Sequence, residues 1–325
     1  MEKLNFSVIA KKYSDEAEAY KFLESVRWEN GVVCPHCGSV NTAKFISPRH
    51  GERTTRNGTK SYRRVWLCGA CKKQFSVLLG TIFEDSRIPL SKWLLAIHGL
   101  NSDKNGISSH ELARKLGITQ KSAWFMAHRI REAMTHSPLA SKLSGTVEAD
   151  ETYIGGKAEN MHKWKREQVI KGRGTVGKTP VFTIVARGGE VRSQVMKNVT
   201  GKHVQSALRA NVDPRAALMT DTSTVYPQAG KEFASHETVD HSAGEFVRGA
   251  AHVNTAEGFF GQLKPSLRGT YRHVSDKHLN RYLSEFDYRY TTRKTADGNR
   301  TLSAIQQAHG KRLTYAALIQ NKGEI

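Results

Sequence analysis

The chain has 325 residues, and its 50 lysines and arginines against 30 aspartates and glutamates give a formal net charge of +20. Hydrophobic residues make up 38%, enough to bury a core, which excludes a largely disordered chain. The apolar runs are far shorter than the roughly 20 residues that cross a bilayer, and the first residues lack the apolar stretch of a secretory signal. Such a basic chain favours nucleic acid as partner and no membrane, with added solubility as the alternative role of the charge.

The first predicted element is a helix over residues 14–28, which Ser14 can cap. Two Cys-x-x-Cys units follow, and they hold all four cysteines of the chain: Cys34, Cys37, Cys68 and Cys71. Four thiolates in two such pairs are typical of a closed, structural Zn²⁺ site, with redox-active cysteines as the alternative. The 30 residues between the pairs fit a zinc ribbon with a long basic hairpin. Reduced cysteines of this kind also indicate a cytoplasmic location.

Residues 89–135 are predicted to form three helices, the first opened by Pro89. Ser108 or Ser109 can cap the second and Thr119 the third, with a turn around Gly117 between them. This is the layout of a helix-turn-helix, whose second helix enters the major groove of DNA; an ordinary helical hairpin is the alternative. We expect the third helix to expose a polar face that contacts DNA through Gln120, Lys121, Ser122 and Arg129, with His128 also exposed.

From residue 143 the pattern changes to that of an α/β layer fold. Strands are predicted over residues 145–154, 181–186, 190–196 and 217–220, and helices over 202–210, 254–267, 278–290 and 302–309. Gly188 and Gly189 predict a hairpin turn between the second and third strands.

Residues 155–179 are Gly-rich and basic and are predicted to be a loop. The loop carries seven cations and two acids between residues 157 and 178. It can clamp the DNA backbone, or it can be a solvated linker. The cations are Lys157, Lys163, Lys165, Arg166, Lys171, Arg173 and Lys178.

Three acids stand out for their positions. Asp150 lies in the first of these strands and Asp221 directly follows the last, where ligands of α/β sheets gather. Glu257 lies on the helix 254–267, on a polar face that also carries Asn254, Lys264 and Arg268. Carboxylates brought together from distant segments repel one another unless a divalent ion lies between them. Two Mg²⁺ ions in such a site would support in-line displacement at a phosphodiester.

At these residues the chain resembles the DDE transposases, most closely bacterial insertion-sequence transposases with an N-terminal zinc ribbon and a ribonuclease-H-like catalytic domain. The resemblance covers about residues 20–292. It is carried by Asp221 with Tyr226 five residues later and by the segments VEADETYIGGK (147–157), HSAGEFVRG (241–249), NTAEGF (254–259) and RGTY (268–271).

The resemblance implies that Asp150 and Asp221 bind Mg²⁺ or Mn²⁺. Glu257 has the usual spacing for the third acid, with 35 residues between it and Asp221. In this group Asn254 with Lys264 is often taken as the signature instead, so the third catalytic position stays open between Glu257 and Asn254.

The resemblance further implies an insertion-sequence transposase that binds the terminal repeats of its element, cleaves DNA and joins it to a target. We expect it to act as a homodimer or larger assembly on double-stranded DNA, in the bacterial cytoplasm at the nucleoid. Two alternatives are a DNA-binding regulator without cleavage and a nuclease that cuts but never joins. The expected division is an N-terminal helix and zinc ribbon (14–80), a helix-turn-helix region (86–136), a ribonuclease-H-like domain (143–292) and a C-terminal tail (293–325).

Overall fold

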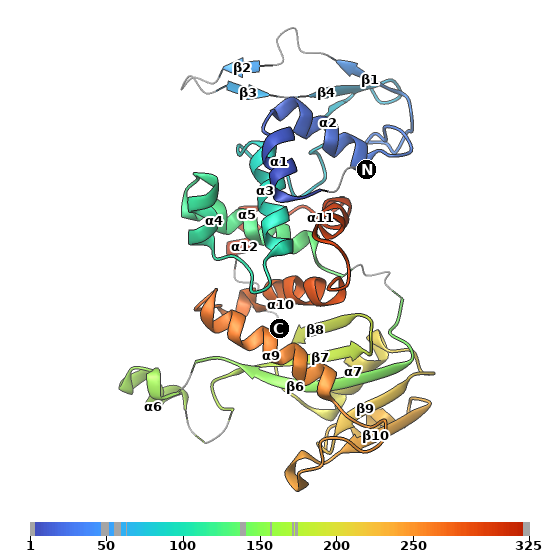
Figure 1. The fold of residues 1–325 in the computed structure, drawn as a ribbon, viewed down its shortest axis with the longest axis vertical. Coiled ribbons are helices and arrows are strands. Elements are labelled where there is room, and N and C mark those ends of the chain that lie inside the picture. Colours follow the sequence, from blue (N-terminus) through green and yellow to red (C-terminus); the bar gives the residue numbers. More distant parts are fainter. Residues whose placement is uncertain are drawn as a thin grey trace. The chain divides into compact units, whose positions relative to one another are not determined.

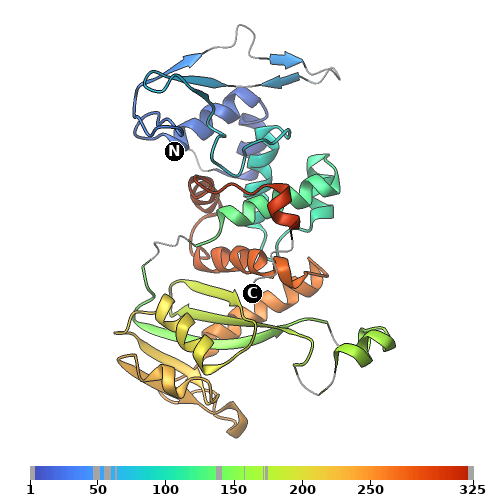
Figure 2. The ribbon, with the colours of Figure 1, turned by 180° about the vertical axis from the view of Figure 1, so that it is seen from behind.

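The computed structural model describes residues 4–46, 52–54, 60–62, 64–136, 141–156, 158–170, 172 and 175–320. The chain divides into two compact units. Met1–Thr135 and Thr292–Gln320 build the first, and His136–Thr291 builds most of the second. Figures 1 and 2 draw the ribbon from two opposite sides.

The first unit begins with two helices, α1 (Phe6–Lys12) and α2 (Glu16–Arg27). The α2 helix lies within the predicted range, but its cap is Asp15 and not Ser14: the Asp15 carboxylate accepts a hydrogen bond of 2.9 Å from the Ala17 N–H. The helix α1 was not predicted. The shift of the cap by one residue is small, because Ser and Asp satisfy the free N–H groups of a first turn about equally well.

The cysteine region forms the predicted ribbon. The strands β1 (Ala43–Ile46), β4 (Val65–Cys68) and β5 (Gln74–Phe75) form an antiparallel sheet in the order β1-β4-β5. Between β1 and β4, the short strands β2 (Glu52–Thr54) and β3 (Lys60–Tyr62) pair antiparallel with each other. The long interval between the two cysteine pairs is therefore a hairpin, as its length predicts.

Three helices then follow as predicted: α3 (Leu90–Ser102), α4 (Ser109–Leu116) and α5 (Gln120–Ala133). Ser108 caps α4 by accepting from the Glu111 N–H at 3.2 Å, and Thr119 caps α5 by accepting from the Ser122 N–H at 3.2 Å. Gly117 ends α4 at a φ of +58°, in the left-handed region that glycine enters most easily. Two C-terminal helices complete the unit, α11 (Asp297–Gln306) and α12 (Tyr315–Ile319).

The second unit is built on a five-stranded mixed sheet. Its strands, in the order β10-β9-β6-β7-β8, are β10 (Ser235–Val239), β9 (Ala217–Asp221), β6 (Thr146–Ile154), β7 (Thr179–Ala186) and β8 (Val191–Val195). The strands β6, β7 and β8, which follow one another along the chain, pair antiparallel. By contrast, β9 runs parallel to β6, and β10 runs parallel to β9. This is the ribonuclease-H-like arrangement that the resemblance implies, and the predicted fold class is confirmed.

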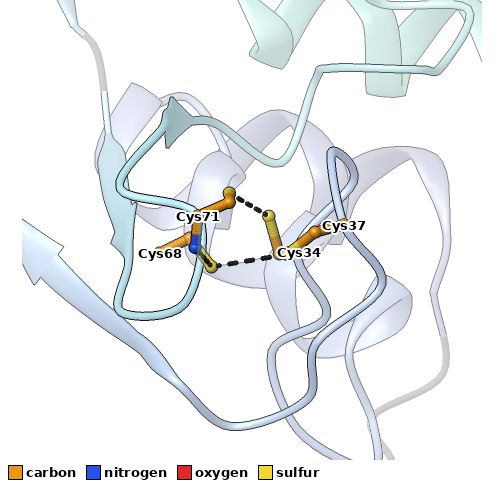
Figure 3. A group of neighbouring side chains, drawn as sticks. All are labelled: Cys34, Cys37, Cys68 and Cys71. Carbon is orange, nitrogen blue, oxygen red and sulfur yellow. Dashed lines mark hydrogen bonds between the residues drawn. The ribbon is translucent and has the colours of Figure 1, made fainter.

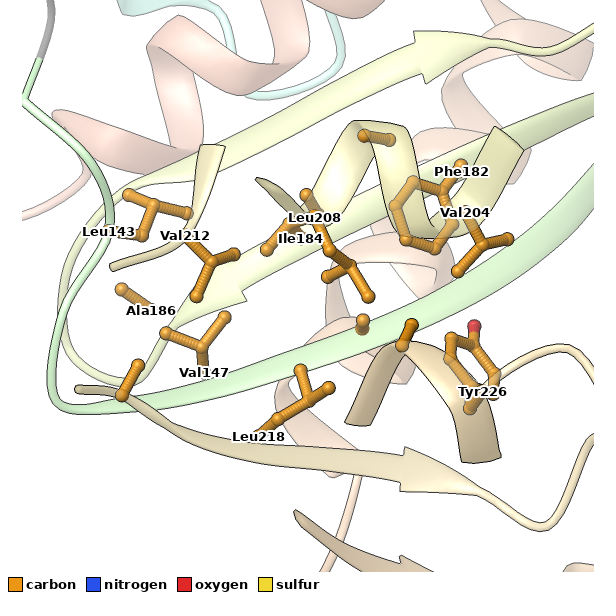
Figure 4. Close-up of a cluster of buried hydrophobic side chains, with 14 of the residues drawn as sticks. Leu143, Val147, Phe182, Ile184, Ala186, Val204, Leu208, Val212, Leu218 and Tyr226 are labelled. Carbon is orange, nitrogen blue, oxygen red and sulfur yellow. The ribbon is translucent and has the colours of Figure 1, made fainter. Parts of the chain in front are cut away.

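Helices cover both faces of this sheet, as the two views show (Figures 1 and 2). One core lies between the sheet and α7 (Gly201–Asn211) with the short α8 (Pro227–Gly230); it includes Val147, Phe182 and Leu208 (Figure 4). The other core lies between the sheet and α9 (Asn254–Gly269) with α10 (Asp276–Thr291), and includes Val181 and Val185. Because side chains alternate along β7, its neighbouring residues serve opposite cores.

The segment 155–179, predicted to be a loop, contains a short 3₁₀ turn, Ala158–Asn160, and a helix, α6 (Lys163–Val169). The prediction of no regular structure is therefore wrong for α6. The helix lacks a side-chain cap and an apolar stripe, so neither of the two usual sequence signals of a helix marks it.

Candidate functional site

The four cysteines form the cluster that their spacing predicts (Figure 3). Their sulfur atoms all lie within 4.8 Å of one another, and the Cys34–Cys71 and Cys37–Cys68 pairs are each 3.7 Å apart. Zn–S bonds of about 2.3 Å in a tetrahedron place neighbouring sulfurs about 3.8 Å apart, so these distances fit Zn²⁺. The donor set leaves no ligand position for water, which makes the site structural.

The surroundings of the cysteines act on them in opposite directions: burial and the neighbouring sulfur atoms raise the pKa of Cys71 to about 11, whereas hydrogen-bond donors favour the thiolate of Cys68. The Ser39 hydroxyl, 3.2 Å from the sulfur atoms of both Cys37 and Cys68, together with the Cys71 N–H lowers the pKa of Cys68 to about 5. Gly69 is needed for packing, since a Cβ there would lie 2.6 Å from the Thr42 carbonyl oxygen.

In the second unit, strand pairing brings two of the predicted acids together. The parallel pairing of β6 with β9 matches Thr146 with Ala217 and Glu148 with Met219. The printed pairing ends there, and Asp150 and Asp221 each follow two residues later, close enough for the charge of Asp221 to act on Asp150. Asp221 pairs with Val239 of β10, so it lies on an inner strand of the sheet.

The third acid comes from α9, whose polar and apolar faces are as predicted. Asn254, Glu257, Gly261 and Arg268 are exposed and Lys264 is half-buried. The opposite stripe is buried in the core: Val253, Ala256, Phe260, Leu263 and Leu267. The Glu257 carboxylate lies 3.4 Å from Nδ1 of His241, a residue that the sequence prediction did not assign to the site. The Lys264 ammonium lies 5.6 Å from the centre of the Phe260 ring.

The electrostatics of Asp150 connect these acids. Burial, and then the negative charges of Glu151, Asp221 and Glu257, raise the pKa of Asp150 to about 7, against a partial opposing effect of the hydrogen bond from the Glu151 N–H. A carboxyl group with this pKa reports crowded negative charge in a poorly solvated place. Such a set of carboxylate oxygens matches the ligand preference of hard divalent cations. Among the described residues, only the four cysteines bring three or more possible metal ligands close enough together to form a candidate ion site.

Comparison with known proteins decides the class of this site. The ISXO2-like transposase domain matches residues 142–291, which include all three acids. The transposase zinc-ribbon domain matches residues 14–74, which include all four cysteines. Both parts of the chain therefore match models of transposase domains. The chain is a DNA transposase of the DDE type, a polynucleotidyl transferase, and the family implies a divalent ion at its carboxylates.

A relative in Halobacterium salinarum carries the description "Uncharacterized protein in transposable element ISH50". It is 29% identical over 287 residues, which are 86% of this chain and 92% of the relative. Among solved structures, the one titled "Crystal structure of a pre-cleavage Mos1 transpososome" contains a chain with 12% identity and a TM-score of 0.27, covering 65% of this chain and 74% of that one.

The helix-turn-helix of the transposase presents only part of the predicted polar face. Gln120 and Lys121 are exposed and Ser122 is half-buried. Arg129 was predicted to contact DNA, but it is only 4% exposed. Its guanidinium donates to the Glu84 carbonyl and lies 5.2 Å from the Trp93 ring. The predicted exposure of Arg129 and of His128, which is fully buried, is therefore wrong: both residues lie on the core side of α5.

The basic segment of the transposase contains a side chain that sequence reasoning missed. Trp164 on α6 is 63% exposed, beside the exposed Lys163 and the half-buried Arg166. The described structure includes the backbone of Lys165 but not its side chain, and Lys157, Lys171 and Arg173 lie outside the described residues. A tryptophan in the middle of a run of cations was the available signal, because such residues commonly serve nucleic-acid binding.

Two further acids of the transposase were also missed, both in β6. Glu151 accepts a hydrogen bond from the Tyr226 hydroxyl, and burial raises the pKa of both groups. Glu148 is fully buried and binds the start of α9. Their spacing was a signal in the sequence: a strand whose other residues pack into two hydrophobic cores also carries acids before and after Asp150.

No helix within the described part of the transposase is long and apolar enough to span a membrane.

Proposed function

We propose that Asp150, Asp221 and Glu257 bind Mg²⁺ or Mn²⁺ and that the transposase uses this site to cleave the ends of its element and join them to target DNA. The observation that carries the proposal is that one transposase domain, residues 142–291, holds all three acids, with Asp150 and Asp221 on the paired strands β6 and β9. The charges of Asp221 and Glu257 also contribute to the raised pKa of Asp150, after burial and the charge of Glu151. When bound, two such ions activate water or a 3′-hydroxyl and stabilise the leaving oxygen of an in-line displacement.

The chain itself supplies ligands and orientation. The paired strands β6 and β9 carry two of the carboxylates, and α9, which covers one face of the sheet, presents the third. On the same face of α9, Lys264 and the exposed Arg268 are placed to pair with phosphates of the DNA backbone. Gly261 lies between Glu257 and Lys264 in sequence and is open to solvent, with no neighbouring atom where a Cβ would stand. It leaves room for a DNA strand to approach the helix.

Glu257 is favoured over Asn254 as the third position because its charge acts on Asp150, whereas an amide carries none. Glu257→Gln keeps the shape and removes the charge. We expect it to reduce end cleavage by more than about 100-fold. Loss of a residue that only hydrogen-bonds to a metal ligand already costs about 10- to 100-fold, and loss of a ligand should cost more. Glu257→Gln should also reduce the number of Mn²⁺ ions bound per chain, counted by electron paramagnetic resonance.

Asn254→Ala is the matched variant on the same helical face. It should leave the Mn²⁺ count unchanged, with a smaller effect on cleavage. The opposite pattern, with ion binding lost in Asn254→Ala and retained in Glu257→Gln, would move the third position to Asn254.

The remaining parts are proposed to bind DNA. Residues 14–80 and 86–136 recognise the terminal repeats, with Gln120, Lys121 and Ser122 facing the major groove, and residues 143–292 perform the chemistry. Lys163, Lys165 and Arg166 contact the backbone. Two element ends must be held together, so the active form is a homodimer or larger, acting in the bacterial cytoplasm at the nucleoid. The four cysteines hold structural Zn²⁺.

A further inference from the structure

Glu148 is a buried acid whose role the metal site does not explain. It lies two residues before Asp150 in β6 and is fully buried. A buried carboxylate is costly unless hydrogen bonds and opposite charges surround it. Its partners therefore show what holds it in place.

The main partner of Glu148 is the first turn of α9. Its Oε2 accepts hydrogen bonds from the Thr255 N–H at 2.8 Å and the Ala256 N–H at 3.0 Å, and its Oε1 accepts from the Thr255 hydroxyl at 2.8 Å. The residue at the cap position of α9, Val253, provides no side-chain hydrogen bond. Glu148 thus caps this helix from a strand more than 100 residues earlier, and its charge matches the positive end of the helix dipole.

Arg187 extends the same connection to the segment that leads into α9. Its Nε donates to Glu148 Oε1 at 2.6 Å, while Nη1 donates to the Ala250 carbonyl at 2.8 Å and Nη2 to the His252 carbonyl at 2.9 Å. The His252 Nδ1 also lies 3.2 Å from Glu148 Oε1. One carboxylate therefore holds both the helix start and the preceding loop.

Apolar packing alone does not fix where α9 stands along its axis. Phe259 and Leu263 hold the helix against the sheet, but such contacts are non-directional. Hydrogen bonds to two consecutive N–H groups set both the rotation and the axial position of the helix, because they depend strongly on angle. Glu257 directly follows the capped residues, and Asp150 follows the capping residue by two positions.

We propose that Glu148 is a positioning residue, which sets the distance between the Glu257 carboxylate on α9 and the Asp150 carboxylate on β6. This inference rests on the proposed function, in which these two acids share divalent ions. Glu148 binds no ion itself and touches no DNA; it acts through the helix that it caps.

The test is Glu148→Gln, which keeps the size of the side chain and presents an N–H₂ group to donors that need an acceptor. We expect a loss of about 10- to 100-fold in Mn²⁺ affinity, as for other residues that orient metal ligands, measured by electron paramagnetic resonance titration without DNA. Cleavage should show a lower kcat with an unchanged KM for DNA. A residue that only stabilised the fold would change the melting temperature and leave the affinity for Mn²⁺ per folded chain unchanged.

Glu190→Gln is the matched control. Glu190 is also a glutamate paired with an arginine in this unit, at 3.0 Å from Arg192, but its side chain is 44% exposed. Its Mn²⁺ affinity should equal that of the unmodified protein.

Thr255→Val decides the case if Glu148→Gln does not fold. It removes only the hydroxyl hydrogen bond and should weaken Mn²⁺ binding by a few fold. A folded Glu148→Gln, or failing that a Thr255→Val, with unchanged Mn²⁺ affinity would overturn the inference. If Asp221→Asn and Glu257→Gln also bind Mn²⁺ normally, the proposed metal site itself is wrong, so the two failures are distinguishable.

Discussion

Asp150 combines the two properties that a catalytic carboxylate needs, burial and neighbours of like charge. Its position could be predicted from sequence, because it lies in a predicted strand within a segment that resembles the DDE transposases. The partners of Glu148 on α9 could not, since they are more than 100 residues away in sequence. For Arg129 the sequence prediction was wrong. The helical periodicity placed this residue on the exposed face, but its guanidinium lies 5.2 Å from the Trp93 ring and 5.3 Å from the Phe125 ring, which cover it. Local periodicity does not reveal such a buried cation.

The pKa of Asp150 predicts how its removal affects stability. Its folded-state pKa of about 7 lies above the ordinary value of 3.8, so between these values the folded chain holds more protons than the unfolded chain. The free energy of unfolding therefore falls as pH rises through this window, and the loss is complete above pH 7. Asp150→Asn avoids the loss, so it should raise the melting temperature by a few degrees, more at pH 8 than at pH 5.

This comparison is made by calorimetry in Mg²⁺-free buffer without chelator, so that the zinc ribbon keeps its ion. Asp213→Asn is the control, because hydrogen bonds from Arg215 lower the pKa of Asp213 to about 2. Its folded-state pKa lies below the unfolded value, so at pH 8 this variant should not gain stability. An Asp150→Asn variant that is no more stable than the unmodified protein at pH 8 would contradict the account of Asp150.

At the scale of elements, the strands and helices that build the two cores were predictable because their apolar residues alternate or recur every turn. The strands β6 to β9 and the helix α9 all lie where the sequence predicts them. The edge strand β10 was missed, since its sequence SHETV is mostly polar and only Val239 is buried. The helix α6 was missed for the related reason that its sequence KWKREQV carries no apolar stripe. Elements without a core face leave a weak sequence signal.

The composition of α6 predicts two separable contributions to DNA binding. Replacing Lys163, Lys165 and Arg166 together by Gln should weaken binding and reduce the slope of log affinity against log salt by about 0.9 for each phosphate that these cations neutralise. Trp164→Ala should weaken binding by about 1–3 kcal/mol if the ring stacks on a base, with the salt slope unchanged.

Fluorescence anisotropy at several salt concentrations, with a labelled duplex that carries a single-stranded extension, measures both effects. Arg215→Gln is the control, since this cation is on the same unit, is 90% exposed and already pairs with Asp213. A triple variant with an unchanged salt slope would remove α6 from the DNA interface.

At the scale of the whole molecule, the chain leaves the first unit after Thr135 and returns to it at Thr292. The zinc ribbon and helix-turn-helix thus share a unit with α11 and α12, and the ribonuclease-H-like sheet is inserted between α5 and α11. The sequence indicated the order of these parts but not the return of the chain, which depends on long-range contacts such as the hydrogen bond from Lys311 to the Ala133 carbonyl at 2.9 Å.

The central claim is that one carboxylate site both cuts and joins DNA, and strand transfer tests it most directly. Purified protein is incubated with a labelled duplex carrying the terminal repeat of its element, a plasmid target and Mg²⁺, in parallel with Asp221→Ala. We expect label joined to plasmid with the unmodified protein and none with the variant, although both bind the duplex. Cleavage without joining would indicate a nuclease, and binding alone would indicate a regulator. Joined product from Asp221→Ala would contradict the assigned site.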